Sequence, residues 1–180
     1  MPAVLNRINE FFVPETGMLS LGFGHNTCSC ENCSDASGRG TVWNRIPQIY
    51  SAVYGELCPT DEDILLGFQG QFIVSAARIR GNTRRMYKHL LDLLVSNAKH
   101  WIHKDVRDEK IFSDDASDPY FGHQVERSWM LIFQCADPKL ANTCSRLGMK
   151  RGGEAGKEVD SCQCVDAPPK KVKGVKGRGV

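Results

Sequence analysis

The sequence predicts an α/β protein in which a partial mixed sheet is flanked by amphipathic helices. Two observations carry this prediction. The stretch ILLGFQGQFIVS, residues 64–75, has the apolar content of a buried strand, or of two short strands broken at the glycines. The segments on either side of it place apolar residues at helical spacing. At 180 residues, the chain is long enough to bury a hydrophobic core.

Three parts follow one another along the chain. Residues 1–40 form a Cys/Gly-rich irregular segment, because five glycines interrupt any long element there. Residues 41–138 form the α/β core. Residues 139–180 form a flexible basic tail, since hydrophobic periodicity is lost after Pro138.

The core contains three expected helices. The first covers residues 42–54, where Pro47 favours a kink or a late start. The second covers residues 83–100 and follows an arginine-rich turn. The third has Asp118 as its N-cap and Pro119 as its first helical residue, and it runs to about residue 134.

The net charge of +2 is unevenly distributed along the chain. Residues 168–180 hold five Lys and Arg residues and no acid, so the remainder is slightly acidic. This distribution argues against a nucleic-acid partner for the folded part and leaves the basic tail as the one segment that could contact nucleic acid. A disordered solubilising tail is the alternative.

The cysteines are numerous, with eight in the chain. Polar residues interrupt the apolar N-terminus, so no usable signal sequence is present, and no apolar run is long enough to span a membrane. These features favour a cytoplasmic protein whose cysteines are thiols or metal ligands rather than disulfides. If the chain is a fragment of a longer protein, the secretory pathway stays open.

A basic turn follows the predicted strand. Arg78, Arg80, Arg84 and Arg85 surround Gly81, just before and within the first turn of a helix. Guanidinium groups bind phosphate and carboxylate oxygens, and a helix N-terminus adds backbone donors and a favourable dipole. The pattern predicts a phosphate-binding site, against the alternative of a solvated basic turn.

An acid and a histidine share one face of the third helix. Glu126 follows His123 by three residues, so the pair could act as a general base with an orienting partner, or as two metal ligands. The alternative is an ordinary polar face opposite Trp129 and Phe133.

A third cluster lies near the N-terminus. His25, Cys28, Cys30 and Cys33 are four potential zinc ligands within nine residues, and Cys58 could complete such a site through space. The spacing has only one C-x-x-C pair, so unmetallated or oxidised cysteines are the alternative to a structural zinc site.

Four stretches, in this order, carry a family resemblance: CSCENC, WNRIPQIYSAVYG, GFQGQFIVSAARIRGNTRRMYKHLLDLL and HQVERSWMLIF. Together they resemble the C-terminal half of the eukaryotic domain-of-unknown-function family three-four-three-one, found largely in fungi and algae. The matching positions are Gly70, Gln71, Phe72, Val74, Ser75, Ile79, Tyr87, Leu90, Leu91, Leu93, Leu94, Glu126, Arg127, Trp129, Ile132 and Phe133. The family's N-terminal half has no counterpart here, which implies a partial domain.

The family's layout is similar to that of glycosyltransferases with the A-type fold. The resemblance implies a glycosyltransferase-A-like half domain that acts on a nucleotide-sugar donor, a small phosphate-containing substrate, with Mn or Mg as cofactor. By that analogy Gln71, Phe72 and Ser75 line the acceptor side, Glu126 is the base, and Ser75 is counted with Glu126 and His123 among the catalytic residues. The arginines would face the diphosphate, so all these groups should converge on one pocket. The alternatives are a non-catalytic cysteine-rich zinc or interaction module, or an inactive fragment.

Overall fold

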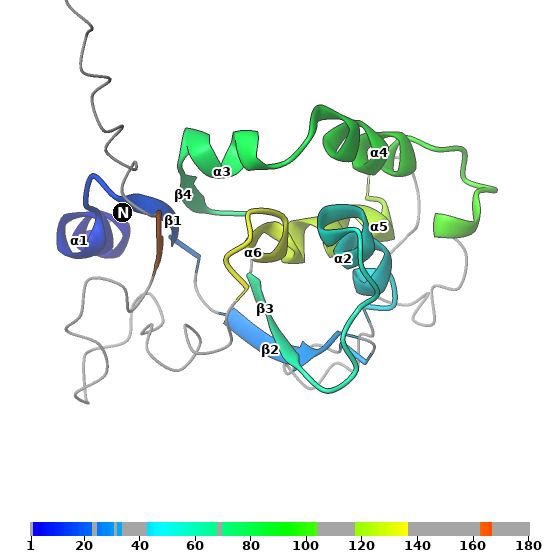
Figure 1. The fold of residues 1–180 in the computed structure, drawn as a ribbon, viewed down its shortest axis with the longest axis horizontal. Helices are drawn as coiled ribbons and strands as arrows, with labels where there is room; N and C mark the ends of the chain where they lie inside the picture. The colour runs from blue at the N-terminus through cyan, green and yellow to red at the C-terminus, as the bar shows by residue number, and fades with distance from the viewer. Residues whose placement is uncertain are drawn as a thin grey trace, which may run out of the picture.

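The computed structural model of the chain describes residues 2–22, 25–30, 32–33, 43–67, 70–103, 118–136 and 163–166. Its helices are α1 (Pro2–Phe11), α2 (Ile46–Tyr54), α3 (Ala76–Gly81), α4 (Arg84–Leu94), the 3-10 helix η1 (Trp101–His103), α5 (Tyr120–Arg127) and α6 (Trp129–Ile132). Its strands are β1 (Thr16–Ser20), β2 (His25–Ser29), β3 (Asp63–Gly67), β4 (Phe72–Val74) and β5 (Gln163–Val165). The expected mixture of helix and strand is confirmed (Figure 1).

The strands form two small sheets. The larger has the order β4-β1-β5, and the smaller pairs β2 with β3. All three strand pairings are antiparallel, so the expected mixed sheet is wrong for the part of the chain that the structure describes. Connection length does not decide this, because long segments separate the paired strands. Antiparallel pairing is slightly more stable per residue than parallel pairing and is the commoner arrangement.

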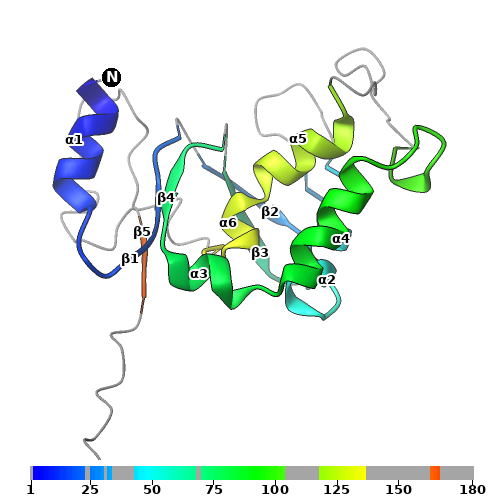
Figure 2. The ribbon, with the colours of Figure 1, turned by 90° about the horizontal axis from the view of Figure 1, so that it is seen from above.

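The central strand β1 is buried along its whole length. Successive side chains of a strand point to opposite faces, and here Met18 joins the main hydrophobic core while Leu19 packs with Phe11 of α1. Figure 2 shows the three-stranded sheet between α1 on one side and α5 and α6 on the other. The chain therefore uses both faces of β1 for packing.

The main core lies where β3, α2 and α6 meet. Its fully buried side chains are Met18, Trp43, Ile46, Ile49, Leu65, Leu66, Ile102, Phe121, Met130, Leu131 and Ile132. Most of these residues come from the first and third predicted helices and from the predicted strand stretch. Met18 lies in the segment that was expected to be irregular, and Ile102 lies beyond the second predicted helix, so the apolar periodicity located only part of the core. Among the described residues, no helix combines the length and the apolar character needed to cross a bilayer.

The strand stretch divides as the glycines predict. Residues 64–75 hold most of β3 and all of β4, with Gly70 between them in the left-handed region (φ 56°). The first expected helix also begins late, as Pro47 predicts. Pro47 occupies the first turn of α2, where its missing N–H costs no hydrogen bond.

The other two expected helices are each shorter. The arginine-rich turn is itself the helix α3, and an extended Asn82 (ψ 147°) separates it from α4, which ends at Leu94 rather than at residue 100. The third helix breaks at Ser128, whose Oγ donates to the Gln124 carbonyl oxygen (2.7 Å), a bond that bends helices. The N-cap of α5 is Pro119 rather than Asp118.

The two terminal parts of the chain differ most from expectation. The segment expected to be irregular, residues 1–40, contains α1, β1 and β2. The segment expected to be a flexible tail contributes β5, which pairs with β1. The basic residues 168–180 and the acidic loop before Asp118 lie outside the described residues.

Six cysteines form disulfides, so the expected thiol state is wrong. The pairs are Cys28–Cys33, Cys30–Cys58 and Cys135–Cys164. Cys144 and Cys162 lie outside the described residues. The expectation rested on the absence of a signal sequence, whereas the packing of the chain brings these cysteines to Cα separations of 5.0 to 5.8 Å, which a disulfide can bridge.

Candidate functional site

A small pocket lies where β1, β3, the turn before β4 and the helices α5 and α6 meet. Its lining residues are Met18, Ser20, Gly67, Gly70, Gln71, Phe72, Glu126, Trp129 and Met130. Its volume is about 10 Å³, roughly the space that one water molecule or one hydroxyl group requires. Three residues that the sequence assigned to the acceptor side and to the base, Gln71, Phe72 and Glu126, are thus neighbours in the structure.

Aromatic rings form one wall of this pocket. Phe72 lies 5.5 Å from Trp129 between ring centroids, and Trp129 stacks on Phe133 at 5.7 Å. A Cβ at Gly70 would come within 3.1 Å of the Trp129 indole nitrogen, so glycine lets the indole lie against the turn before β4. The turn and the indole are therefore packed directly on each other.

Glu126 is the one acid among the described residues of the pocket wall. Its side chain is 33% exposed, and its carboxylate has two weak neighbours. Arg127 donates from Nη1 to Oε1 at 3.3 Å, and His123 Nδ1 lies 3.8 Å from Oε2. An ionised carboxylate has about four lone-pair sites that accept hydrogen bonds. With only these two contacts, Glu126 can still accept hydrogen bonds from another partner.

His123 connects Glu126 to a second acid. Its Nε2 lies 2.6 Å from Asp118 Oδ1. The Nε2 atom can donate to Asp118, whereas the 3.8 Å separation from Glu126 is a contact between charged groups rather than a hydrogen bond. The expected pairing of His123 with Glu126 on one helix face is confirmed, and Asp118 anchors the ring from the residues that precede α5.

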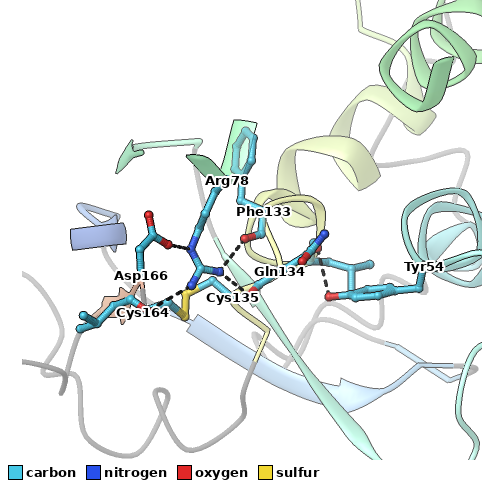
Figure 3. Close-up of a disulfide and its surroundings, with 9 residues drawn as sticks. Tyr54, Arg78, Phe133, Gln134, Cys135, Cys164 and Asp166 are labelled. Carbon is cyan, nitrogen blue, oxygen red and sulfur yellow. Dashed lines mark hydrogen bonds and ion pairs between the residues drawn. A yellow bond between two sulfur atoms is a disulfide. The ribbon is translucent and has the colours of Figure 1, made fainter. Parts of the chain in front are cut away.

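Ser75 and Arg78 belong to a different cluster, shown in part in Figure 3. Ser75 is the N-cap of α3, since its Oγ accepts from the Arg78 backbone N–H (3.1 Å) and donates to Asp166 Oδ2 (2.5 Å). Arg78 donates from Nε to Asp166 Oδ1 at 2.9 Å. Its Nη1 donates to the carbonyl oxygens of Phe133 and Gln134 at 2.9 and 2.6 Å. We call the residues Ser75, Arg78 and Asp166 the β4–α3 junction.

The junction fastens the last described strand to the core. The disulfide Cys135–Cys164 joins the residue after Gln134 to the middle of β5, next to the Arg78 guanidinium (Figure 3). Gln134 has a left-handed backbone (φ 54°), which ends α6 just before this disulfide. Nearby, burial raises the pKa of Tyr54 to about 12, so its hydroxyl stays protonated and donates to the Leu131 carbonyl oxygen (3.3 Å).

The four arginines do not converge on the Glu126 pocket. Arg78 binds protein oxygens in the junction, while Arg80, Arg84 and Arg85 are exposed on α3 and α4. Neither they nor Ser75 line the pocket that contains Glu126. The expectation of one shared pocket therefore holds only for Gln71, Phe72 and Glu126.

The predicted metal ligands are occupied by disulfide bonds. Cys28 pairs with Cys33 and Cys30 with Cys58, and the side chain of His25 lies outside the described part of the structure. A disulfide sulfur is not the thiolate that zinc requires. Across the described ranges, no group of three His, Cys, Asp or Glu side chains could hold a metal ion.

The sequence did not indicate Asp166 or the role of Gly17. A Cβ at Gly17 would clash with the side chains of Arg78 and Asp166, so the junction needs a glycine on β1. The available signal was Cys164, because a cysteine in a segment without hydrophobic periodicity can mark a covalent tether to the core.

Comparison with protein-family models, with curated proteins and with solved structures finds no match for this chain. The resemblance stated from its motifs therefore stays a prediction.

Proposed function

We propose that the chain supplies the acceptor side and the general base of an enzyme that transfers a sugar, or a similar group, from an activated phosphate donor. The observation that carries this proposal is that Glu126 of α5 meets Gln71 and Phe72 at one pocket. These are residues that the resemblance to family three-four-three-one assigns to base and acceptor binding. The membership of the chain in that family is part of the proposal.

In the proposed transfer reaction, Glu126 acts as the general base. An acceptor hydroxyl enters the pocket, and Glu126 removes its proton. The acceptor oxygen then attacks the sugar's anomeric carbon. The bond from that carbon to the donor's phosphate oxygen breaks, and its electron pair leaves with the nucleoside diphosphate. Asp118 and His123 orient the carboxylate during proton transfer.

The donor's phosphates need other partners than Arg78, whose hydrogen bonds are directed at protein oxygens. We propose Arg80, Arg84 and Arg85 as phosphate ligands because their side chains are exposed, although they do not line the Glu126 pocket. Mn or Mg is the cofactor that such donors imply. Since no metal-binding group occurs among the described residues, no step is assigned to the metal.

The experiment is a transfer assay on the full chain, purified with its disulfides intact. Release of nucleoside diphosphate is measured for a panel of nucleotide sugars with glycan acceptors, with and without Mn²⁺ or Mg²⁺. The variant Glu126→Gln should lose about 10²- to 10⁴-fold in kcat, the usual contribution of a general base. The matched control Glu62→Gln removes an exposed acid outside the pocket and should retain full activity.

Two results would contradict the proposal. One is the absence of turnover together with no thermal stabilisation by any donor, since a ligand at about 100 times its dissociation constant stabilises by about 2.7 kcal/mol. The other is turnover that Glu126→Gln leaves intact.

The three disulfides favour a second candidate function, a non-catalytic binding module of an oxidising compartment. Disulfides of this density form and persist in secreted or lumenal proteins and are rare in the cytosol. Ligand binding without turnover would favour this module over the transferase.

A further inference from the structure

A second, larger hollow lies apart from the Glu126 pocket and shares no lining residue with it. It is a groove between α2 and α4, bounded by the loop 55–60 and by Trp101 of η1. We call it the α2–α4 groove. Its volume is about 580 Å³, within the range of about 300 to 1,000 Å³ that is typical of small-molecule sites.

Both ends of the groove are held in place. At one end, the disulfide of Cys58 to the fully buried Cys30 fastens the loop 55–60. At the other end, Arg45 donates from Nη2 to the Trp101 carbonyl oxygen (2.9 Å) and lies 5.1 Å from the centroid of its ring. A site held in this way binds a ligand with little loss of its own conformational entropy.

The lining of the groove is uncharged. Its described lining residues include no Lys, Arg, Asp or Glu. Among them a phosphate or carboxylate ligand would find no guanidinium or ammonium partner, and the Arg45 guanidinium at the end of the groove already donates to the carbonyl oxygens of Ile102 and Trp101. The chemistry of the groove therefore fits a neutral ligand.

Several hydrogen-bonding side chains in the lining are available to a ligand. Ser51, Thr60 and His89 make no side-chain hydrogen bond to any residue within the described ranges. An apolar ligand that covered them would leave buried donors and acceptors unpaired, which disfavours its binding. A ligand rich in hydroxyl groups would pair with them instead.

The same lining offers two exposed apolar groups. The Trp101 side chain is 47% exposed and Leu57 is 90% exposed. An indole face carries negative charge density, which attracts the positively polarised C–H bonds on one face of a sugar ring. Because the Arg45 guanidinium lies over one face of the Trp101 ring, the sugar would pack on the opposite face.

We propose that the α2–α4 groove binds a neutral oligosaccharide, with one sugar ring on Trp101 and its hydroxyl groups paired with Ser51, Thr60 and His89. Such binding needs no transfer chemistry. It would occur in an enzyme, as a glycan-holding site apart from the base, and equally in a non-catalytic module.

The test is a titration of the full oxidised chain with neutral hexasaccharides of glucose, mannose and N-acetylglucosamine. Binding is followed by tryptophan fluorescence and by calorimetry. At least one of these glycans should bind saturably. Ser51→Phe, which fills the groove, and Trp101→Ala should each weaken binding at least about tenfold, equivalent to about 1.4 kcal/mol. Leu91→Ala is the matched control, because Leu91 is exposed on α4 outside the groove and its removal should leave affinity unchanged.

Folding defects are separated from loss of the site by thermal unfolding of each variant. Leu57→Ala gives an independent check, since a side chain that is 90% exposed is not needed for folding but should weaken binding at the groove. Glu126→Gln should bind the glycan like the wild type, which distinguishes failure of the groove from failure of the proposed transferase.

Three outcomes would overturn the proposal. One is the absence of saturable binding by all three glycans. Another is wild-type affinity in both Ser51→Phe and Leu57→Ala. The third is tighter binding of an acidic oligosaccharide, such as hexagalacturonate, or of an apolar dye, such as anilinonaphthalene sulfonate, than of any neutral glycan.

Discussion

Two polar clusters lie at the two ends of β4, and they differ in how tightly protein partners bind their charged groups. After the strand, in the β4–α3 junction, Arg78 and Asp166 are only 17% and 25% exposed and bind each other. Before the strand, at the pocket, Glu126 is 33% exposed and its neighbours stand at 3.3 and 3.8 Å. The junction groups are committed to protein partners, whereas the Glu126 carboxylate retains acceptor capacity.

This difference distinguishes polar residues that stabilise the fold, in the β4–α3 junction, from a polar residue that is available for function, in the pocket. A shielded guanidinium that donates to a carboxylate and to two carbonyl oxygens holds segments together, and its removal leaves those oxygens without a donor. A partly exposed acid with weak contacts contributes little to folding and is free to react. The comparison predicts that junction variants lower stability, while pocket variants lower activity.

The largest effect on stability is expected for the double variant Cys135→Ser, Cys164→Ser. The sequence separation of 29 residues corresponds to a closed loop whose cross-link stabilises by about 3 to 4 kcal/mol in the chain-entropy account. The free energy of unfolding, measured by denaturant titration, should fall by about that amount. A loss below about 1 kcal/mol would show that the ion pair of the junction holds β5 without the disulfide.

Arg78→Ala should be next, with a loss of about 2 to 4 kcal/mol. The variant removes the donor of Asp166 Oδ1 and of the carbonyl oxygens of Phe133 and Gln134, while Asp166 Oδ2 keeps its hydrogen bond from Ser75. Arg80→Ala is the matched control, since Arg80 is exposed on the same helix and should change stability by less than about 0.5 kcal/mol. Equal effects in the two variants would remove the distinction between a structural and a solvated arginine.

Gly17→Ala is expected to cost about 1 to 3 kcal/mol, the range for overpacking. Its added methyl group meets Arg78, Asp166 and the Cys164 carbonyl oxygen. Gly81→Ala adds the same methyl group to the end of α3, where nothing lies within 4 Å, and should be neutral or stabilising. Thermal unfolding of the pair measures how tightly the junction is packed, and a neutral Gly17→Ala would contradict that packing.

Glu126→Gln should have the smallest effect on stability, below about 0.5 kcal/mol. Its carboxylate is partly exposed and has only weak protein contacts. Denaturant titration beside the transfer assay would then show a variant that is folded but inactive. A loss above about 2 kcal/mol would place Glu126 with the structural residues instead.

Local features of this protein could be predicted from its sequence. Apolar periodicity located the core segments α2, β3 and α6 but not β1, the glycines separated β3 from β4, and Pro47 delayed the start of α2. The spacing of His123 and Glu126 placed them on one helix face. These features follow from the backbone preferences and side-chain period of a few adjacent residues, so they need no knowledge of the rest of the chain.

The tertiary structure alone decided how distant residues are used. The pairing of Cys135 with Cys164 and of Arg78 with Asp166 joins positions that are 29 and 88 residues apart. The α2–α4 groove likewise combines residues from two helices, a loop and η1. Such contacts depend on which segments pack side by side, and no local preference encodes that choice. An arginine-rich turn could therefore be recognised from sequence, but only packing decided that Arg78 holds the fold together while Glu126 stays open to a ligand.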